Sequence, residues 1–396
     1  MLQRGKGLRK SAPSTSERLV RRGLLAVMVV GIVIVGISEM IYTLTHQPAG
    51  IDFAPLWTAA RLAATTPERI YDFAKVTGLQ QWFLRGYFGM RPYAYPPSAL
   101  LVLSPFAAAP FAWAYGLWVV ATGAFMAWAA ARLCPARPWM AALLTLLATP
   151  NFTVIDTGQT TFLIAGLVAL AVPEANRRPW LAGALFAFAA LIKPTTLILT
   201  PFALLSGGHW RALAWSVAVG LAGVAVSALV FGVPTWFDWL SAVPRFQRLI
   251  ENPYMLPAAI TPSGAAIAFG MRGLPLLAVR LLCVLFAAGV IWRVWRNTDD
   301  SAVRMAVLLG GGILAAPYAL QYDAALLAPA AAATMIATLD RPDWLRGLAG
   351  ILLLTAAGIP HAGAFAIIAV VPVLAWPGLG IDYSTFLRRQ PSVSTP

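Results

Sequence analysis

The sequence WRALAWSVAVGLAGVAVSALVF occupies residues 210–231 and contains a single charged side chain, Arg211, near its start. As a helix it would be about 33 Å long, enough to cross the roughly 30 Å hydrocarbon layer of a bilayer. Residues 23–42 and 274–294 have the same apolar character. Of the 396 residues, 59% are hydrophobic and 11% are charged, whereas soluble domains are about 25% charged. The sequence therefore predicts an all-α, polytopic integral membrane protein.

Thirteen apolar segments follow one another along the chain. They lie near residues 23–43, 96–109, 111–131, 138–150, 160–173, 179–192, 195–205, 210–231, 274–295, 303–317, 324–338, 345–358 and 361–376. Residues 1–22 carry seven Lys or Arg and are expected to form a disordered basic cytoplasmic leader. No small-residue cleavage pattern follows the first segment, so we expect it to remain as a helix. We predict one membrane domain over residues 23–380 and a cytoplasmic tail over residues 381–396.

The arginines of the short connectors predict the orientation, because cytoplasmic loops concentrate Lys and Arg. One side is marked by Arg132, Arg137, Arg177, Arg178, Arg211, Arg293, Arg296, Arg304, Arg341, Arg346, Arg388 and Arg389. The connectors at 151–159, 318–323 and 358–362 contain neither residue type and are expected to face outward. Both termini then lie in the cytoplasm, so the number of crossings is even. We predict about twelve, with the short, proline-broken segment 96–109 either entering the membrane only in part or packing at an angle.

Two long non-membrane stretches, residues 44–95 and 232–273, fall on the outer side in this orientation. Within the first, residues 54–64 and 69–88 mix apolar and charged side chains, a pattern that suits short helices lying along the interface. Outer loops of this kind can cap a cavity.

Composition also limits the partners. The net charge of +14 is compatible with nucleic acid, but beyond the leader the basic residues are scattered singly, which favours anionic membrane lipids instead. The three histidines are spread over both predicted sides, and the two cysteines show no metal-ligand spacing, so we expect neither a metal site nor a disulfide. Nucleotide-binding P-loop, α/β-hydrolase and zincin motifs are absent from the sequence.

Asp52 is the first candidate for chemistry. It follows the first apolar segment by about ten residues, in the string Gly50-Ile51-Asp52-Phe53. A carboxylate on the outer side can act as a general base toward an acceptor hydroxyl. An aspartate before a helical run can equally be an N-cap, and the sequence leaves both roles open.

Lys193 is the second candidate, because it is the only lysine after Lys75 and is followed by the helix-breaking Pro194. A lysine at the outer end of a helix is a point charge suited to a phosphate, and backbone groups freed by the proline can bind there too. The alternative is a side chain that snorkels to the interface.

The short outer connectors add polar groups that suit a sugar. They supply Asn151, Asp156 and Gly158-Gln159 from one connector, and Tyr318 and Gln321-Tyr322-Asp323 from another. Each can be a cap or an ordinary loop residue. Their joint placement on one side with Asp52 and Lys193 favours a binding role.

Several strings, taken in order, resemble glycosyltransferase family 87, which contains polyprenol-phosphate-mannose-dependent α-mannosyltransferases. They are Asp52-Phe53, Trp57-Thr58-Ala59-Ala60-Arg61-Leu62, Ile70-Tyr71-Asp72, Tyr95-Pro96-Pro97, Leu100 to Pro105, Gly158-Gln159, Lys193-Pro194 and Pro317-Tyr318 to Tyr322-Asp323. The resemblance spans most of the chain, from about residue 50 to residue 330. In family members the last of these connectors can carry histidines, which Gln321, Tyr322 and Asp323 replace here.

The resemblance implies a GT-C fold and a polyprenyl-phosphate sugar as donor. It assigns Asp52 as the catalytic base of an inverting transfer, with Lys193, joined by Arg91, steadying the leaving phosphate. The remaining expected substrate-binding residues are Tyr95, Gln159, Tyr322 and Asp323. The expected reaction moves a hexose, mannose first, to a lipid or glycan acceptor on the outer face of the cytoplasmic membrane, as part of cell-envelope assembly. It needs no cofactor and no metal.

A secondary transporter is the alternative from another class, because about twelve crossings with broken helices and charges in the membrane also describe transporters. The absence of an inverted repeat and the length of the loop 44–95 argue against it. A flippase or scaffold for an envelope precursor is the third possibility.

Overall fold

The computed structural model describes residues 48–84, 89–252, 256–340, 344–360 and 362–375, with six isolated positions between 30 and 45. This part of the chain is helical and contains no strand, apart from a single antiparallel bridge between Ala259 and Leu320. The all-α prediction is therefore confirmed. The predicted leader 1–22, nearly all of the first span 23–43 and the tail 381–396 lie outside the described residues.

The α-helices in chain order are α2 (Phe53–Thr65), α3 (Phe73–Gln80), α4 (Leu100–Leu103), α5 (Phe111–Leu133), α6 (Pro138–Leu146), α7 (Thr149–Thr157), α8 (Thr161–Arg177), α9 (Pro179–Ile192), α10 (Thr200–Ser206), α11 (Trp210–Phe231), α12 (Pro234–Ile250), α13 (Pro262–Ala268), α14 (Gly273–Asn297), α15 (Ser301–Ala315), α16 (Ala328–Asp340), α17 (Trp344–Thr355) and α18 (Ala362–Ala375). Short 3-10 helices are η1 (Pro67–Arg69), η2 (Pro97–Ala99), η3 (Ser104–Ala108), η4 (Pro194–Leu197), η5 (Leu256–Ala258) and η6 (Gln321–Leu327).

Four of the described helices are long and apolar enough to cross a membrane: α5, α11, α14 and the continuous helix Gln321–Leu339. A fifth crossing is possible if the bent pair α6 and α7 counts as one span, and six shorter apolar helices accompany them. A polytopic membrane protein is confirmed, while the number of twelve crossings stays a prediction. The segment 96–109 forms the three short pieces η2, α4 and η3, so its predicted break at the prolines is observed.

The predicted outer connector 151–159 is itself largely helical. Pro150 lies at the N-terminal end of α7, and Gly158 ends that helix in the left-handed conformation, with φ of 76°. The axes of α6 and α7 differ by 63°. The apolar segment predicted at 138–150 therefore consists of α6 and the first residues of α7, with a sharp bend between the two helices, and the end of α7 contacts the turn that carries Asp52.

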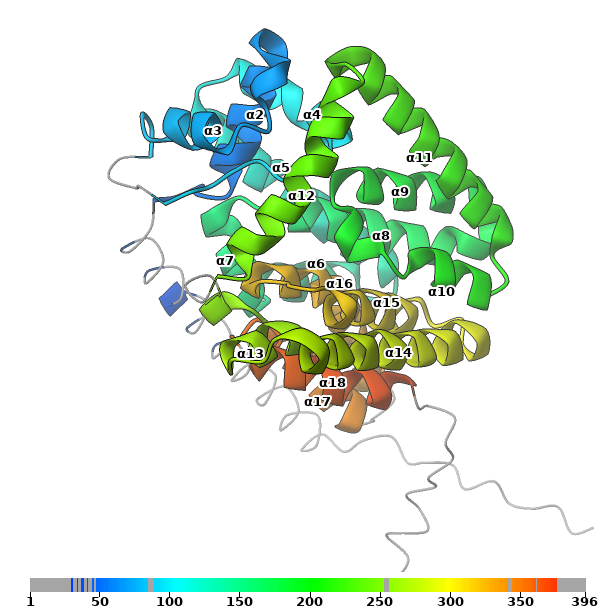
Figure 1. Cartoon of the computed structure of the whole chain (residues 1–396). Coiled ribbons are helices and arrows are strands. Elements are labelled where there is room, and N and C mark those ends of the chain that lie inside the picture. Colours follow the sequence, from blue (N-terminus) through cyan, green and yellow to red (C-terminus); the bar gives the residue numbers. More distant parts are fainter. Residues whose placement is uncertain are drawn as a thin grey trace, which may run out of the picture.

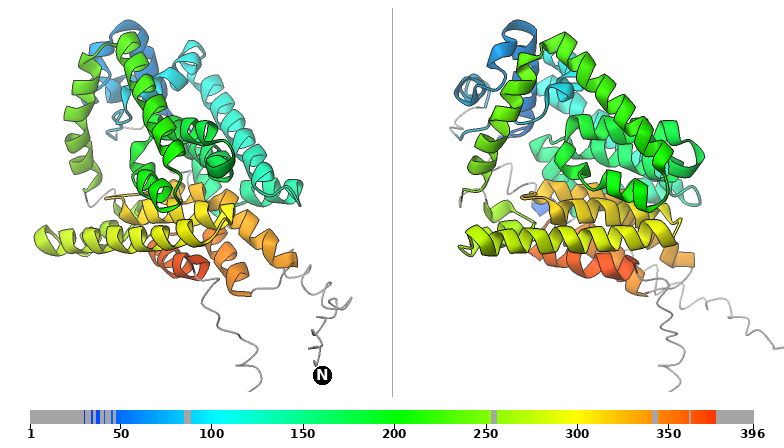
Figure 2. Two further views of the ribbon diagram at one scale, coloured as in Figure 1. Left: turned by 90° about the vertical axis from the view of Figure 1, so that its right-hand side faces the viewer. Right: turned by 45° about the vertical axis from the view of Figure 1, so that its right-hand side comes forward.

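The core lies around α8, which packs between α5 and α9, and around α15 and η6. Helices α9 and α11 approach closely at Gly183, which has no side chain to keep them apart. A Cβ atom at this position would lie only 2.5 Å from the Ala212 carbonyl oxygen. In Figure 1, α2 to α4 lie at one end of the molecule and α14 to α18 at the other. Helix α12 runs along one side of the molecule between these two ends (Figure 2). It therefore covers the helices that lie behind it on that side.

Candidate active site

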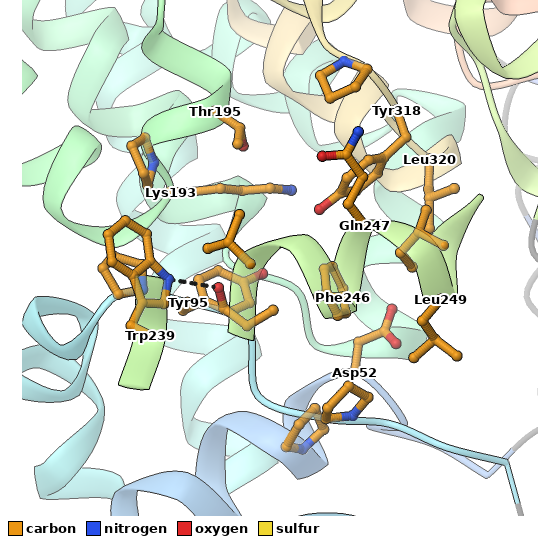
Figure 3. Close-up of a pocket in the computed structure, with 18 of the residues that line it drawn as sticks. Asp52, Tyr95, Lys193, Thr195, Trp239, Phe246, Gln247, Leu249, Tyr318 and Leu320 are labelled. Carbon is orange, nitrogen blue, oxygen red and sulfur yellow. Dashed lines mark hydrogen bonds between the residues drawn. The ribbon is translucent and has the colours of Figure 1, made fainter. Parts of the chain in front are cut away.

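A cavity of ≈ 480 Å³ lies behind α12, and most of the predicted site residues line it (Figure 3). Its wall is built from the loop before η2, the start of α8, the break between α9 and η4, the face of α12 and the connector before η6. The predicted residues in this wall are Asp52, Arg91, Tyr95, Gln159, Lys193 and Tyr322. Asp323 lies beside them and contacts the cavity through Lys193.

The turn that carries Asp52 is fixed to the end of α7. The backbone N–H of Asp52 donates to the Thr157 carbonyl at 2.9 Å, and that of Gly50 donates to the Asp156 carbonyl at 2.7 Å. These bonds satisfy carbonyls that the end of a helix leaves free. A side chain on Gly158 would place its Cβ 2.6 Å from Cβ of Phe53, so glycine is required for this close approach. Asp52 is thus held by a helix end about one hundred residues away in sequence.

The Asp52 carboxylate faces the cavity and does not cap α2. Asp52 occupies the N-cap position, but its side chain makes no cap hydrogen bond there. It accepts a hydrogen bond at 2.7 Å from Nη1 of Arg91, and only 9% of its side chain is exposed. By contrast, Asp72 does cap α3, through the backbone N–H of Lys75. The geometry therefore excludes the capping alternative for Asp52.

Lys193 points inward from the break between α9 and η4 (Figure 3). Its ammonium lies 2.5 Å from Oδ1 of Asp323 and 5.3 Å from the ring centroid of Tyr322. The other Asp323 oxygen accepts a hydrogen bond from the Leu320 backbone N–H at 3.0 Å. Because the Lys193 side chain is only 17% exposed and ends in an ion pair, it does not snorkel.

Tyr95 and Gln159 are uncharged polar residues that line the same cavity as Asp52 and Lys193. The Tyr95 phenol donates to Oε1 of Gln159 at 2.6 Å, and the Trp118 indole donates to the Gln159 carbonyl at 3.4 Å. Burial raises the pKa of Tyr95, an effect that Lys193 partly opposes, so the phenol stays neutral and donates. The site therefore offers neutral hydrogen-bonding groups between a carboxylate and an ammonium.

Two other predicted polar residues lie elsewhere. Asn151 is buried and donates to the carbonyls of Thr145 and Leu146, so it stabilises the bend between α6 and α7. Asp156 is 2% exposed and does not line the cavity; within the described residues neither of its carboxylate oxygens has a hydrogen-bond partner.

Helix α12 contributes a wall of the cavity that is not among the predicted site residues. Trp239 anchors this helix by donating to the Ala94 carbonyl at 3.1 Å, and the Phe246 ring packs against that of Tyr318 at 6.1 Å. Gln247 adds an amide to the lining. The signal was present, since residues 234–250 begin with a proline and have a strongly amphipathic helical pattern.

A family model described as glycosyltransferase family 87 matches residues 93–317. The chain belongs to glycosyltransferase family 87. Of the predicted residues that line the cavity, the matched region contains Tyr95, Gln159 and Lys193, and it also contains the whole of α12. No curated protein and no solved structure matches the chain. The family 87 assignment confirms the prediction of a membrane glycosyltransferase and gives no support to a transporter or a flippase.

Proposed function

We propose that this family 87 member transfers a hexose, mannose first, from a polyprenyl-phosphate sugar to a lipid or glycan acceptor, with inversion at the anomeric carbon. The observation that carries the proposal is that the Asp52 carboxylate and the Lys193 ammonium enter one cavity from different sides (Figure 3). Its volume of ≈ 480 Å³ is typical of small-molecule sites, which measure about 300–1,000 Å³.

Asp52 is the proposed general base. Its carboxylate takes the proton from the acceptor hydroxyl as that oxygen forms a bond to the anomeric carbon of the sugar. The bond from the anomeric carbon to the phosphate oxygen breaks, and polyprenyl phosphate leaves with the electron pair. Arg91 holds one carboxylate oxygen at 2.7 Å, which orients the base. The prediction that Arg91 also contacts the phosphate remains part of the proposal.

Lys193 is the proposed partner of the leaving phosphate. A lysine ammonium has three N–H donors, and Asp323 accepts one of them. The remaining two can bind phosphate oxygens, where charge increases as the bond breaks. Lys193 can thus balance the charge on the phosphate, so we propose that no metal and no other cofactor takes part.

The lipid carrier is supported by the character of the α12 wall. Leu240 and Val243 of α12 line the cavity and remain exposed, as does Ile198 beside η4. These exposed apolar side chains offer an isoprenoid chain a surface on which to bury its methyl and methylene groups. A nucleotide sugar would have no use for such a surface.

The proposed location of the cavity is the outer, periplasmic side of the cytoplasmic membrane. Helix α9 supports it, because α9 begins next to Arg178, on the predicted cytoplasmic side, and ends next to Lys193 in the cavity.

The experiment is a donor comparison with the purified protein in lipid vesicles. Radiolabelled polyprenyl-phosphate mannose, glucose and arabinose are each supplied with a total lipid extract as acceptor. We expect label to move from mannose donor to the extract, with release of polyprenyl phosphate. If every donor stayed intact, or crossed the vesicle membrane uncleaved, the proposal would be wrong.

A further inference from the structure

A second hollow lies on the outer surface of the helix bundle, where α9 and α11 begin. Its volume is ≈ 520 Å³, and it is lined by Pro179, Trp180, Trp210, Arg211, Ala214, Trp215 and Ala218. The three tryptophans are 55%, 62% and 50% exposed in chain order. The close contact of Gly183 with Ala212 holds the two helices together beside it. The hollow is therefore an open groove with aromatic walls on a fixed pair of helices.

The groove carries positive charge without a matching carboxylate. The Arg211 guanidinium lies 5.4 Å from the ring centroid of Trp210, and no described acidic side chain forms an ion pair with it. Arg178 precedes α9 and makes one long contact, 3.9 Å, with Glu174. Arg177 is exposed as well. Three arginines with a single glutamate make this end of the helix pair complementary to an anion.

The groove is separate from the sugar-transfer cavity. Helix α9 has 14 residues, begins at the groove with Pro179 and ends beside Lys193 in the cavity. Its length of about 21 Å separates the two sites. The reacting groups of the donor and the acceptor therefore do not lie in the groove.

We propose that the groove binds an anionic phospholipid from the leaflet at this end of α9. The guanidinium of Arg211 binds the lipid phosphate, for which its planar fork of donors is suited. The acyl chain lies along Ala214 and Ala218, between the rings of Trp180 and Trp215. Tryptophan rings prefer the headgroup level of a bilayer, which places the phosphate at the height of Arg211. The bound lipid holds the first turns of α9 and α11 together.

Native mass spectrometry of the full-length protein in detergent tests this inference. Phosphatidylglycerol and phosphatidylcholine with identical acyl chains are titrated separately. Both lipids carry a phosphate, but the choline ammonium of phosphatidylcholine is repelled by the Arg211 guanidinium, so we expect the wild type to bind phosphatidylglycerol about tenfold more tightly. Arg211→Gln should abolish that preference, because it removes the charge that distinguishes the two headgroups. Ala218→Trp fills the groove at an exposed position and should reduce binding of both lipids. Equal affinity of the wild type for the two lipids would refute the inference.

Arg296 provides the matched control. It also stacks on an exposed tryptophan ring, that of Trp292, with 5.5 Å between guanidinium and ring centroid, but it does not line the groove. Arg296→Gln should leave the preference for phosphatidylglycerol unchanged. If it lowers the preference as much as Arg211→Gln does, the lipid binds by diffuse charge and the groove is not a site. Thermal unfolding of each variant shows whether it is folded.

Discussion

At the scale of single residues, the cavity is organised by two ion pairs that join distant parts of the chain. Asp52 pairs with Arg91, 39 positions later, and Lys193 pairs with Asp323, 130 positions later. The sequence indicates Asp52 and Lys193 as unusual, because a charge next to apolar segments is energetically expensive. It does not indicate their partners, because no local pattern connects residues so far apart. Because each pair joins one positive and one negative side chain, the two pairs together add no net charge to the cavity.

The pair of Lys193 with Asp323 determines how the lysine can be tested. Lys193→Ala leaves a buried carboxylate unpaired, which should lower the free energy of unfolding by about 3–5 kcal/mol. In the double variant Lys193→Ala, Asp323→Asn that charge is absent, so most of the stability should return. The affinity for the lipid-phosphate donor should stay about tenfold weaker in both variants, because the ammonium is missing.

Thermal unfolding and donor titration measure the two quantities separately. Asp323→Asn alone is the control and should keep the donor affinity, since Lys193 remains. If the double variant bound the donor as tightly as the wild type, Lys193 would not be a ligand of the donor phosphate.

At the scale of elements, the end of α7 positions the Asp52 turn through Gly158. Gly158→Ala places a side chain at φ of 76° and 2.6 Å from Cβ of Phe53. We expect a loss of at least about 1–2 kcal/mol of stability from the left-handed conformation alone. Displacement of Asp52 by about 1 Å should lower turnover up to about a hundredfold.

Gly208→Ala is the matched control for this substitution. Gly208 has φ of 74°, but a Cβ there meets no atom within 4 Å. Thermal unfolding of this variant should show the loss of stability that the left-handed conformation causes. Its rate of donor cleavage should equal that of the wild type. Equal turnover of both variants would show that the junction of α7 with the Asp52 turn does not position the base.

The C-terminal end of α12 is held by Glu251, which accepts a hydrogen bond at 2.6 Å from Arg280 of α14. Burial raises the pKa of Glu251, but hydrogen bonds from Gln247 and Arg280 outweigh it and leave the pKa below its ordinary value of 4.5. The stabilisation is therefore present above about pH 4.5 and lost as the pH falls through the lower folded pKa. Both side chains are partly exposed, so the contribution is at most about 1 kcal/mol.

Glu251→Gln should accordingly unfold at a lower temperature than the wild type at pH 7. The difference should shrink toward zero at acidic pH, where Glu251 of the wild type is protonated. Thermal unfolding across this pH range measures it. A difference that grows as the pH falls would contradict the assignment of this ion pair.

Helix α12 is the element of the site that its sequence did not predict. Its residues lie in the stretch 232–273, which was predicted only as an outer loop because it has no long apolar run. An amphipathic helix buries one face, and here that face covers the cavity with Trp239 and Phe246. The partner of such a face is set by tertiary packing, so the position of α12 over the site was not predictable from its own sequence.

At the scale of the whole molecule, the apolar pattern was sufficient to locate the long apolar helices, although not the amphipathic α12. The segment predicted at 210–231 is α11, and that at 179–192 is α9, with the same bounds. The thickness of the hydrocarbon layer sets the length of the apolar run that a membrane helix needs, so such helices can be predicted from sequence. The bend of 63° between α6 and α7 was not predicted, because it depends on how the second helix packs against its neighbours.

The predicted orientation places the loop 44–95 outside and the arginine-rich connectors inside. Trp82 and Asp299 are 87% and 86% exposed on these two predicted sides. In a background with Cys134→Ser and Cys283→Ser, a membrane-impermeant maleimide should label Trp82→Cys in intact cells, and Asp299→Cys only after permeabilisation. The reverse pattern would place the cavity on the cytoplasmic side.

The most direct measurement of the central claim is the rate at which the purified protein moves label from polyprenyl-phosphate mannose to acceptor, with and without the Asp52 carboxylate. Asp52→Asn should lower the rate by about 10²–10⁴-fold, the usual contribution of a general base, while donor affinity changes less than about twofold. Asp72→Asn, at the aspartate that caps α3 in the same loop, should retain the wild-type rate. An Asp52→Asn variant that transfers sugar as fast as the wild type would contradict the account.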